Sequence, residues 1–283
     1  MLQQLWSELA SSLPPIFSEF RADLPAVEVH RKRDQTILSA ADTAIEQFVV
    51  ASILRLDDRA VIVAEEGTGG RQHDGSTGRV YVVDPIDGTA EFIQRGHLEF
   101  CSVVCVLEDR RPVAAFVLAP ELGLDRTPLC ATVTGPQQPI VINGQEAQLA
   151  GKTWLASATR SKDSPPNNIQ TWLAEAGYTI KARTTSQTLD MLRTAVDIST
   201  VTDMALPSFD VFYRRDQKIW DGVAGMCLAR AAGKLVYGES GNIRDQVDLD
   251  LTVPEPTFVS TFVAPRAVAQ KIWPAAAPAA SRA

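Results

Sequence analysis

Apolar residues recur at helical spacing at the start of the chain, among them Leu5, Leu9 and Leu13. This periodicity predicts a helix with one apolar face over about the first twenty residues. Pro14 and Pro15 lie inside the stretch, so we expect the helix to kink or restart there, because proline lacks a backbone donor.

Acidic residues stand at the ends of predicted elements in the next part of the chain. Ser39-Ala40-Ala41-Asp42 has the capping-box spacing that opens a helix. Val61–Ala64 and residues 80–83 are short apolar runs typical of buried strands. The first strand leads into Glu65-Glu66. The Gly- and Ser-rich stretch 67–78 between the strands predicts a loop.

Strands dominate the middle of the chain, and helices alternate with strands after residue 150. Residues 100–107 and 112–118 predict paired strands that turn at 108–111. The later alternation predicts an α/β half. Its expected elements are a strand at 153–157, a helix at 168–176, a strand at 178–182, a helix at 188–196 and a helix at 220–232 that ends at Gly233.

Composition narrows the possible functions. The 283 residues are 45% hydrophobic and carry a formal net charge of -7, which argues against binding to a nucleic-acid polymer. Four cysteines without metal-site or disulfide spacing favour a reducing compartment. The N-terminus lacks a signal-peptide pattern and no apolar run reaches bilayer length, so we expect a cytoplasmic protein without a membrane span.

The segment Asp84-Pro85-Ile86-Asp87-Gly88-Thr89 carries the strongest chemical signal. Its two carboxylates follow a buried strand, and Gly88 permits a tight turn beside a bound phosphate. Mg²⁺ prefers oxygen ligands of this kind, and further carboxylates stand at Glu65-Glu66 and in Trp220-Asp221. An ordinary Asp-Gly turn is the alternative for the segment taken by itself. The three acidic clusters together favour a metal site.

These motifs resemble those of the inositol monophosphatase superfamily of Mg²⁺-dependent, lithium-sensitive phosphatases. The resemblance covers about residues 30–240. It rests on Ser39-Ala40-Ala41-Asp42, Ala64-Glu65-Glu66, the hexapeptide from Asp84 to Thr89, and Trp220-Asp221-Gly222-Val223-Ala224-Gly225. It implies a layered αβαβα sandwich, with an N-terminal α+β half at 1–148 and a C-terminal α/β half at 149–273. The Ala- and Pro-rich stretch 274–283 predicts a disordered tail.

The resemblance also implies roles for individual residues. One Mg²⁺ is expected on Glu65, Asp84 and the Ile86 carbonyl, and a second on Asp84, Asp87 and Asp221. Asp42 and Thr89 are expected to orient the attacking water, and Glu65 is counted with them in catalysis. Two or three ions per site, inhibition by Li⁺ and a homodimer are implied in the same way. Glu66 matches the family's second acid, and a solvated loop charge is the alternative role for it.

The expected substrate is a small phosphorylated metabolite, and its identity follows from weaker signals. Glu91-Phe92 resembles the 3′(2′),5′-bisphosphate nucleotidase branch, and Arg214 stands where the inositol branch is acidic. Arginine suits a second phosphate. Gly88, Thr89, Glu91, Arg160, Ser186 and Arg214 are the predicted substrate contacts. The leading prediction is hydrolysis of the 3′-phosphate of adenosine 3′,5′-bisphosphate.

Two alternatives stay open. The first is an inositol or other sugar-phosphate phosphatase, since the run Ser186-Gln187-Thr188-Leu189-Asp190 departs from both branches. The second is a catalytically silent binding protein, which the four carboxylates Glu65, Asp84, Asp87 and Asp221 disfavour.

Overall fold

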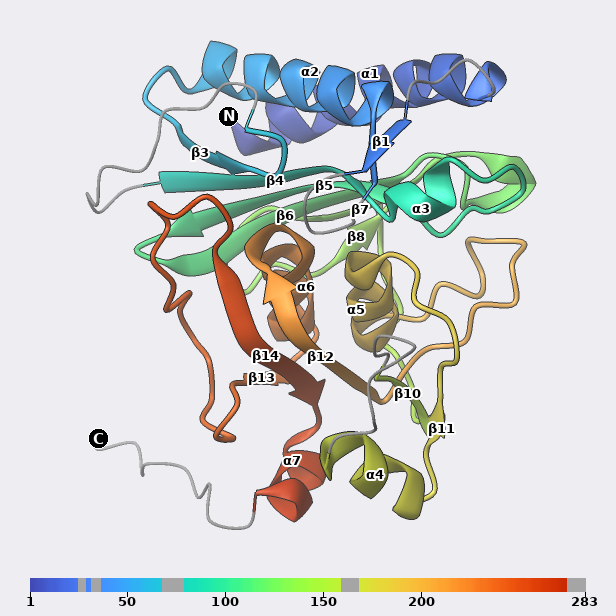
Figure 1. The fold of residues 1–283 in the computed structure, drawn as a ribbon, viewed down its shortest axis with the longest axis vertical. Coiled ribbons are helices and arrows are strands. Elements are labelled where there is room, and N and C mark those ends of the chain that lie inside the picture. The colour runs from blue at the N-terminus through green and yellow to red at the C-terminus, as the bar shows by residue number, and fades with distance from the viewer. Residues whose placement is uncertain (25–28, 32–36, 68–78, 159–167, 274–283) are drawn as a thin grey trace.

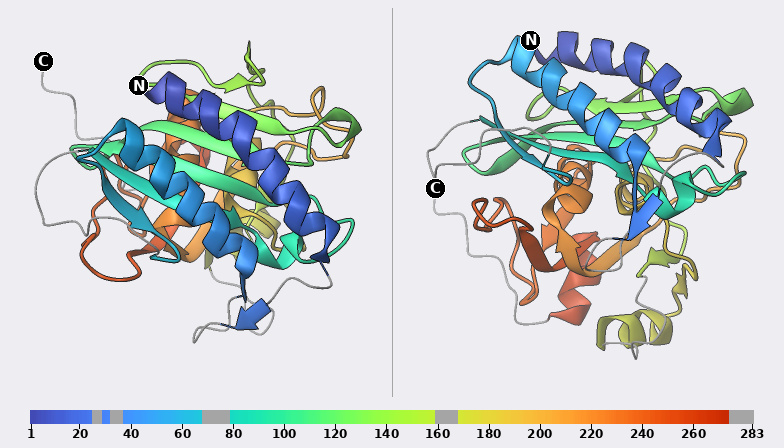
Figure 2. Two further views of the ribbon diagram at one scale, coloured as in Figure 1. Left: turned by 90° about the horizontal axis from the view of Figure 1, so that it is seen from above. Right: turned by 45° about the horizontal axis from the view of Figure 1, so that its top comes forward.

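A computed structural model describes residues 1–24, 29–31, 37–67, 79–158 and 168–273. Within these residues, helices and sheets alternate in five layers (Figures 1 and 2). α1 (Leu2–Ala22) and α2 (Ala40–Leu56) form the outer layer. A seven-stranded sheet lies beneath them, followed by α5 (Gln187–Ala195) with α6 (Ile219–Ala231), a five-stranded sheet, and α4 (Asn168–Glu175) with α7 (Arg266–Ile272). The predicted αβαβα sandwich is confirmed.

The larger sheet has the strand order β3-β4-β5-β6-β7-β8-β9. Only β3 and β4 are parallel, and each later strand runs antiparallel to its neighbour. The strands are β3 (Val61–Ala64), β4 (Arg79–Asp87), β5 (Cys101–Glu108), β6 (Arg111–Ala119), β7 (Leu129–Val133), β8 (Val141–Ile142) and β9 (Gln145–Glu146). The short helix α3 (Thr89–Phe92) follows β4, and a 3₁₀ turn occupies Leu124–Arg126. The predicted hairpin turns at Asp109 and Arg110, both with positive φ.

A separate two-stranded sheet pairs β1 (Val29–Arg31) with β2 (Ile37–Ser39). The smaller of the two main sheets has the order β11-β10-β12-β14-β13. The strands of this smaller sheet are β10 (Leu155–Ser157), β11 (Thr179–Ile180), β12 (Val211–Lys218), β13 (Leu235–Tyr237) and β14 (Thr257–Ala264). β10, β11 and β12 are parallel, and β14 runs antiparallel to both β12 and β13. The described strands of the two sheets are separated by residues 147–154. The division into two halves at residue 148 stays a prediction.

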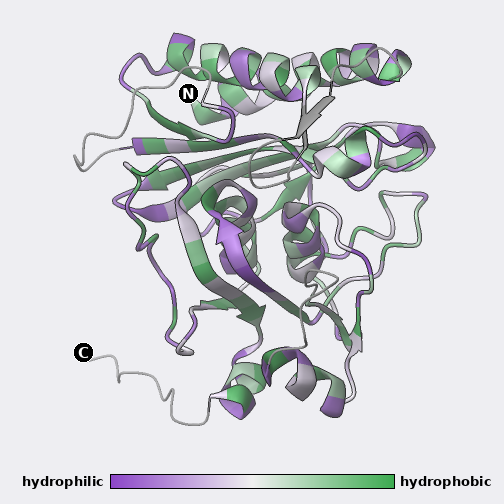
Figure 3. Cartoon of the chain, in the orientation of Figure 1, coloured by the Kyte–Doolittle hydropathy of each residue, from purple (hydrophilic) through white to green (hydrophobic). Residues whose placement is uncertain are grey.

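Three apolar clusters hold the layers together. One lies between α1, α2 and the larger sheet, a second between the two sheets around α5 and α6, and a third beneath the smaller sheet against α4 and α7. α6 is therefore covered on both sides, which explains why nearly all its residues are buried. Figure 3 shows the contrast with β12, whose exposed residues are strongly polar.

The structure differs from the sequence expectations at several places. α1 continues through Pro14 and Pro15 as one helix, and its residues Leu13 and Phe17 are fully buried beside the prolines. Packing on the sheet therefore outweighs the lost backbone hydrogen bonds. β12, β14 and α7 were not predicted. Residues 68–78 of the predicted loop lie outside the described residues, and so does the predicted tail 274–283.

α5 and α6 approach closely because Gly225 lacks a side chain. A Cβ atom at Gly225 would lie 2.5 Å from Cβ of Met191 on α5. We expect Gly225→Ala to lower the free energy of unfolding by about 2 kcal/mol, within the usual cost of overpacking. Denaturant unfolding measures the change.

Gly151→Ala is the matched control, since a Cβ atom there meets nothing within 4 Å. In the double variant with Met191→Gly, the two costs should not add, because glycine removes the Cβ atom that the new methyl group would meet. Unchanged stability of Gly225→Ala would contradict the close approach.

Candidate active site

β4 delivers two carboxylates through an irregularity in its pairing with β5. Asp84 pairs with Val103 and Asp87 pairs with Cys101, so three steps along β4 match two along β5. Such a bulge redirects side chains at a strand end. Gly88 then adopts φ +96°, and a Cβ atom there would lie 3.1 Å from the Glu99 carbonyl oxygen. The predicted tight turn at Gly88 is therefore confirmed.

α6 brings a third carboxylate to the same place. Asp221 lies in the first turn of α6, and one carboxylate oxygen from each of Asp84, Asp87 and Asp221 lies within 4.8 Å of the others. Glu65 follows β3, and its backbone N–H donates to the Val83 carbonyl at 3.2 Å. The structure thus gathers four acids that the sequence separates by up to 156 positions, from Glu65 to Asp221.

The electrostatics of this cluster call for a cation. Asp84 is 1% exposed, and no donor among the described residues reaches either of its carboxylate oxygens. Burial raises the pKa of Asp84 well above its usual value, and the neighbouring charges of Glu65, Asp87 and Asp221 raise it further. Burial raises the pKa of Asp221 well above its usual value, and the charges of Asp87 and Glu65 raise it further, while Arg214 opposes the shift. Oxygen-only ligands of this charge fit Mg²⁺.

The N-terminus of α5 holds Asp87 in position. The Ser186 hydroxyl donates to Asp87 Oδ2 at 2.8 Å, and the backbone N–H groups of Gln187 and Thr188 donate to the same carboxylate at 3.2 and 2.6 Å. Burial raises the pKa of Asp87, and these donors act in the opposite direction. Ser186 also caps α5 by accepting from the Leu189 N–H at 3.0 Å.

Gln187 extends this support to Asp221. Its Nε2 donates to Asp221 Oδ2 at 2.8 Å, and its Oε1 accepts from Gln217 Nε2 at 3.1 Å. Sequence reasoning missed the roles of Gln187 and Thr188. The available signal was a serine three residues before Leu189 at the start of a predicted helix, which marks a free helix N-terminus.

Asp42 and Thr89 meet as predicted. The Thr89 hydroxyl lies 3.1 Å from both Asp42 Oδ1 and the Ile86 carbonyl oxygen. The predicted capping box is present, with the Ser39 N–H donating to Asp42 Oδ2 at 2.8 Å. Burial raises the pKa of Asp42 to about 6, while the hydrogen bonds from Ser39 oppose the shift.

One turn after Asp42, α2 places another buried acid near the cluster. Glu46 is fully buried, and its Oε2 accepts from the Glu66 backbone N–H at 2.7 Å. Glu46 thus positions the segment that carries Glu65 and Glu66. It was missed from the sequence, although its spacing of four from Asp42 places the two on one helix face.

The predicted substrate contacts differ in their surroundings. Glu91 is 5% exposed and pairs with Arg183 and with His97 Nδ1, the latter at 3.0 Å. Ser186 is fully buried against Asp87. Arg214 lies on β12 and is partly buried, and the charges of Asp221, Asp190 and Asp87 act on it. Arg160 lies outside the described residues.

Most of the chain matches a known protein family. The sequence profile of the inositol monophosphatase family matches residues 8–274. The chain belongs to the inositol monophosphatase family. Members of this family are phosphatases, and the chain is accordingly a phosphoric monoester hydrolase.

Curated relatives of the chain include 3′(2′),5′-bisphosphate nucleotidases and Nus factors. The 3′(2′),5′-bisphosphate nucleotidase CysQ of Aggregatibacter actinomycetemcomitans is 33% identical over 99 residues, which cover 35% of this chain and 36% of the relative. CysQ of Escherichia coli K12 is 24% identical over 77% of this chain and 83% of the relative. The Nus factor SuhB of Pseudomonas aeruginosa is 24% identical over 77% and 78%.

Solved structures of family members share the fold of this chain. SuhB of Bartonella henselae matches with a TM-score of 0.71 at 16% identity, covering 98% of this chain and 99% of that one. An IMPase/NADP phosphatase complexed with Mg²⁺ and phosphate matches at 0.72 and 16%, covering 97% and 96%. SaIMPase-II bound to 2′AMP matches at 0.68 and 17%, covering 97% and 92%.

A cation site of the Mg²⁺ type fits the donor set of this family member. Among the described residues, Glu65, Asp84, Asp87, Asp221 and the Ile86 carbonyl are the groups that would hold it. No helix in the described part of the chain is long and apolar enough to cross a bilayer.

Removal of one ligand charge tests this assignment. We expect Asp87→Asn to lower Mg²⁺-dependent hydrolysis of p-nitrophenyl phosphate by at least about 100-fold, because the site loses a carboxylate that the cation needs. Asp216→Asn, an exposed acid on β12, is the control and should keep its activity. Full activity in Asp87→Asn would show that Asp87 does not hold the metal.

The pH dependence of stability gives a second test. Without a divalent cation, the raised pKa values of Asp42, Asp84, Asp87 and Asp221 favour the protonated forms in the folded state. Their contribution to stability is complete below the ordinary value of 3.8 and is lost as pH rises through the raised values.

We therefore expect the Tm of the protein in EDTA to fall between about pH 5 and pH 8, and Mg²⁺ to restore it, by more at pH 8. Thermal unfolding with KCl at matched ionic strength is the control. An equal response to Mg²⁺ and to KCl would argue against a specific site.

Proposed function

We propose that this phosphatase removes the 3′-phosphate from adenosine 3′,5′-bisphosphate or a closely similar nucleotide. Arg214 carries the proposal, because its guanidinium lies close enough to the metal-site carboxylates for the charges of Asp221 and Asp87 to act on it. A guanidinium binds a phosphate through two parallel hydrogen bonds, so it suits a substrate with a second phosphate group. The similarity to CysQ proteins supports the same substrate class.

The residues around Asp84 divide the work of hydrolysis. Bound Mg²⁺ would supply an activated water and neutralise charge on the leaving oxygen. The Thr89 hydroxyl can accept a hydrogen bond from that water while it donates to Asp42. With a pKa of about 6, Asp42 is a stronger base than an ordinary aspartate. The backbone amides of Gly88 and Thr89 would hold the phosphate oxygens at the start of α3.

The positions of Ser186 and Glu91 refine their proposed roles. Ser186 acts through Asp87, since its hydroxyl is committed to that carboxylate. Glu91 orders the neighbouring surface by pairing with Arg183 and His97. Arg183 is half exposed there, and Glu91 balances its charge. Two or three ions per site, inhibition by Li⁺, a homodimer and a cytoplasmic location stay predictions.

Substitution of Arg214 tests the substrate. We expect Arg214→Gln to lower kcat/KM for adenosine 3′,5′-bisphosphate by about tenfold or more, the value of one charge-assisted phosphate contact. Hydrolysis of p-nitrophenyl phosphate should change by less than about threefold. Arg215→Gln is the matched control, because Arg215 is the next residue on β12 and is exposed.

A substrate panel separates the alternatives. Wild-type protein with Mg²⁺ is assayed on adenosine 3′,5′-bisphosphate, inositol 1-phosphate and fructose 1,6-bisphosphate. Preference for either sugar phosphate would overturn the nucleotide proposal and favour a sugar-phosphate phosphatase. Lack of Mg²⁺-dependent turnover on all three and on p-nitrophenyl phosphate would favour a binding protein.

A further inference from the structure

A cavity lies at the edge of the smaller sheet opposite the metal centre. Trp154, Tyr178, Asp210 and Lys234 each stand directly before a strand, namely β10, β11, β12 and β13, and Pro265 directly follows the antiparallel β14. These residues therefore share one edge of the sheet. Asp221 follows the other end of β12, and a strand of 8 residues spans roughly 25 Å. The cavity is thus separate from the active site.

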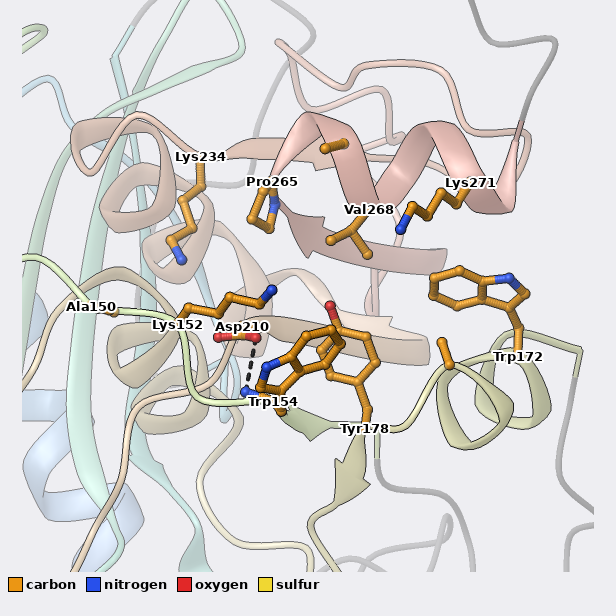
Figure 4. Close-up of a pocket in the computed structure, with 13 residues that line it drawn as sticks. Ala150, Lys152, Trp154, Trp172, Tyr178, Asp210, Lys234, Pro265, Val268 and Lys271 are labelled. Atoms are coloured by element: carbon orange, nitrogen blue, oxygen red, sulfur yellow. Dashed lines mark hydrogen bonds between the residues drawn. The ribbon is translucent and has the colours of Figure 1, made fainter.

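The cavity has the size of a small-molecule site. Its volume is about 490 Å³, within the range of roughly 300–1,000 Å³ that is usual for such sites. α7 forms one side through Val268 and Lys271, and Trp172 comes from α4 (Figure 4). Its walls are therefore drawn from the outermost layer of the fold and from the loops that lead into the sheet.

Aromatic side chains form one wall. Trp154 is 49% exposed, and its ring centroid lies 5.3 Å from that of Tyr178. Lys152 Nζ lies 3.8 Å from the Trp154 ring centroid, so a cation already rests on the indole face. The two ring planes are inclined at 49°, so a planar group can stack on one ring and contact the other at an angle.

The backbone that presents Trp154 is held in an uncommon conformation. Trp154 has φ +59°, a left-handed geometry that is unfavourable for a bulky residue. The buried Asp210 carboxylate maintains it by accepting from the N–H groups of Thr153 at 2.7 Å and Trp154 at 2.9 Å. Figure 4 shows the hydrogen bond that joins Asp210 to the Trp154 backbone. The position of the indole is therefore set by a specific buried interaction.

The charge of the cavity is positive. Lys152, Lys234 and Lys271 come from three separate segments, and Asp210 is the acid among the lining residues. This gives a local charge of about +2 in a chain whose formal net charge is -7. The Asp210 oxygens are also engaged by the backbone. Burial lowers the pKa of Lys234, and Asp210 offsets this only in part. An anion would complete the charge balance.

From this arrangement we propose that the cavity is a second binding site, which takes a planar aromatic anion of the size of a mononucleotide. The ring stacks on the wall formed by Trp154 and Tyr178, and the anionic group lies among Lys152, Lys234 and Lys271. The proposal is independent of the substrate proposed for the metal centre, because it rests on residues at the opposite edge of the sheet.

Binding of AMP to the full chain tests the proposal. Isothermal titration is carried out in EDTA, since the acidic cluster without a cation repels phosphate. We expect one site per chain, and binding at least tenfold weaker for adenosine and for ribose 5-phosphate, which each lack one half of the recognised group.

Three variants locate the site. Trp154→Asn removes the indole while keeping a residue that tolerates left-handed backbone. The double variant Lys152→Gln/Lys234→Gln removes two charges. Each should weaken AMP binding at least tenfold and keep Mg²⁺-dependent phosphatase activity, which reports correct folding. Lys218→Gln is the matched control, because Lys218 lies on β12 outside the cavity and should leave AMP binding unchanged.

Three results would overturn the proposal. AMP binding that Trp154→Asn and the double variant leave unchanged would place the nucleotide elsewhere. Equal binding of adenosine and AMP would remove the anionic requirement. A dimer in light scattering that Trp154→Asn dissociates would assign the cavity to contact with a second copy of the chain.

Discussion

The crowding of carboxylates at the junction of β4 and α6 is the constraint on which the rest of the structure depends. Asp84, Asp87 and Asp221 lie within reach of a single ion, in surroundings that disfavour their charged forms. Folding can hold like charges together in a poorly solvated place only if donors or cations compensate them. The N-terminus of α5 supplies donors to Asp87. Asp84 receives no donor among the described residues, so a metal ion would compensate its charge.

The layered fold makes this arrangement possible. α6 lies between the two sheets, on the face of the larger sheet that α1 and α2 do not cover. Asp221 in the first turn of α6 therefore reaches the end of β4 from that face. α5 must lie against α6 for its N-terminus to reach Asp87, and Gly225 allows that approach. The close packing of α5 on α6 thus accompanies the placement of the donors that reach Asp87.

The two edges of the smaller sheet serve different chemistry. Toward the larger sheet, Lys181, Asp190 and Arg193 form a buried ion network with Glu99, which fixes the loop before α5. At the opposite edge, the lysines of the cavity lack an equal number of acids among its lining residues. The paired charges at the first edge stabilise the structure. The excess of positive charge at the second edge favours the binding of an anionic ligand.

Local sequence determined the parts of this protein that depend on neighbouring residues. The capping box at Ser39, the strand β4 that carries Asp84 and the turn at Gly88 follow from short-range backbone chemistry, and the family resemblance supplied Glu65 and Asp221. Tertiary structure alone decided which donors reach Asp87, since Gln187 and Thr188 lie about 100 positions away in the chain. It also decided that the polar β12 is a strand, because pairing with β14 outweighs its composition.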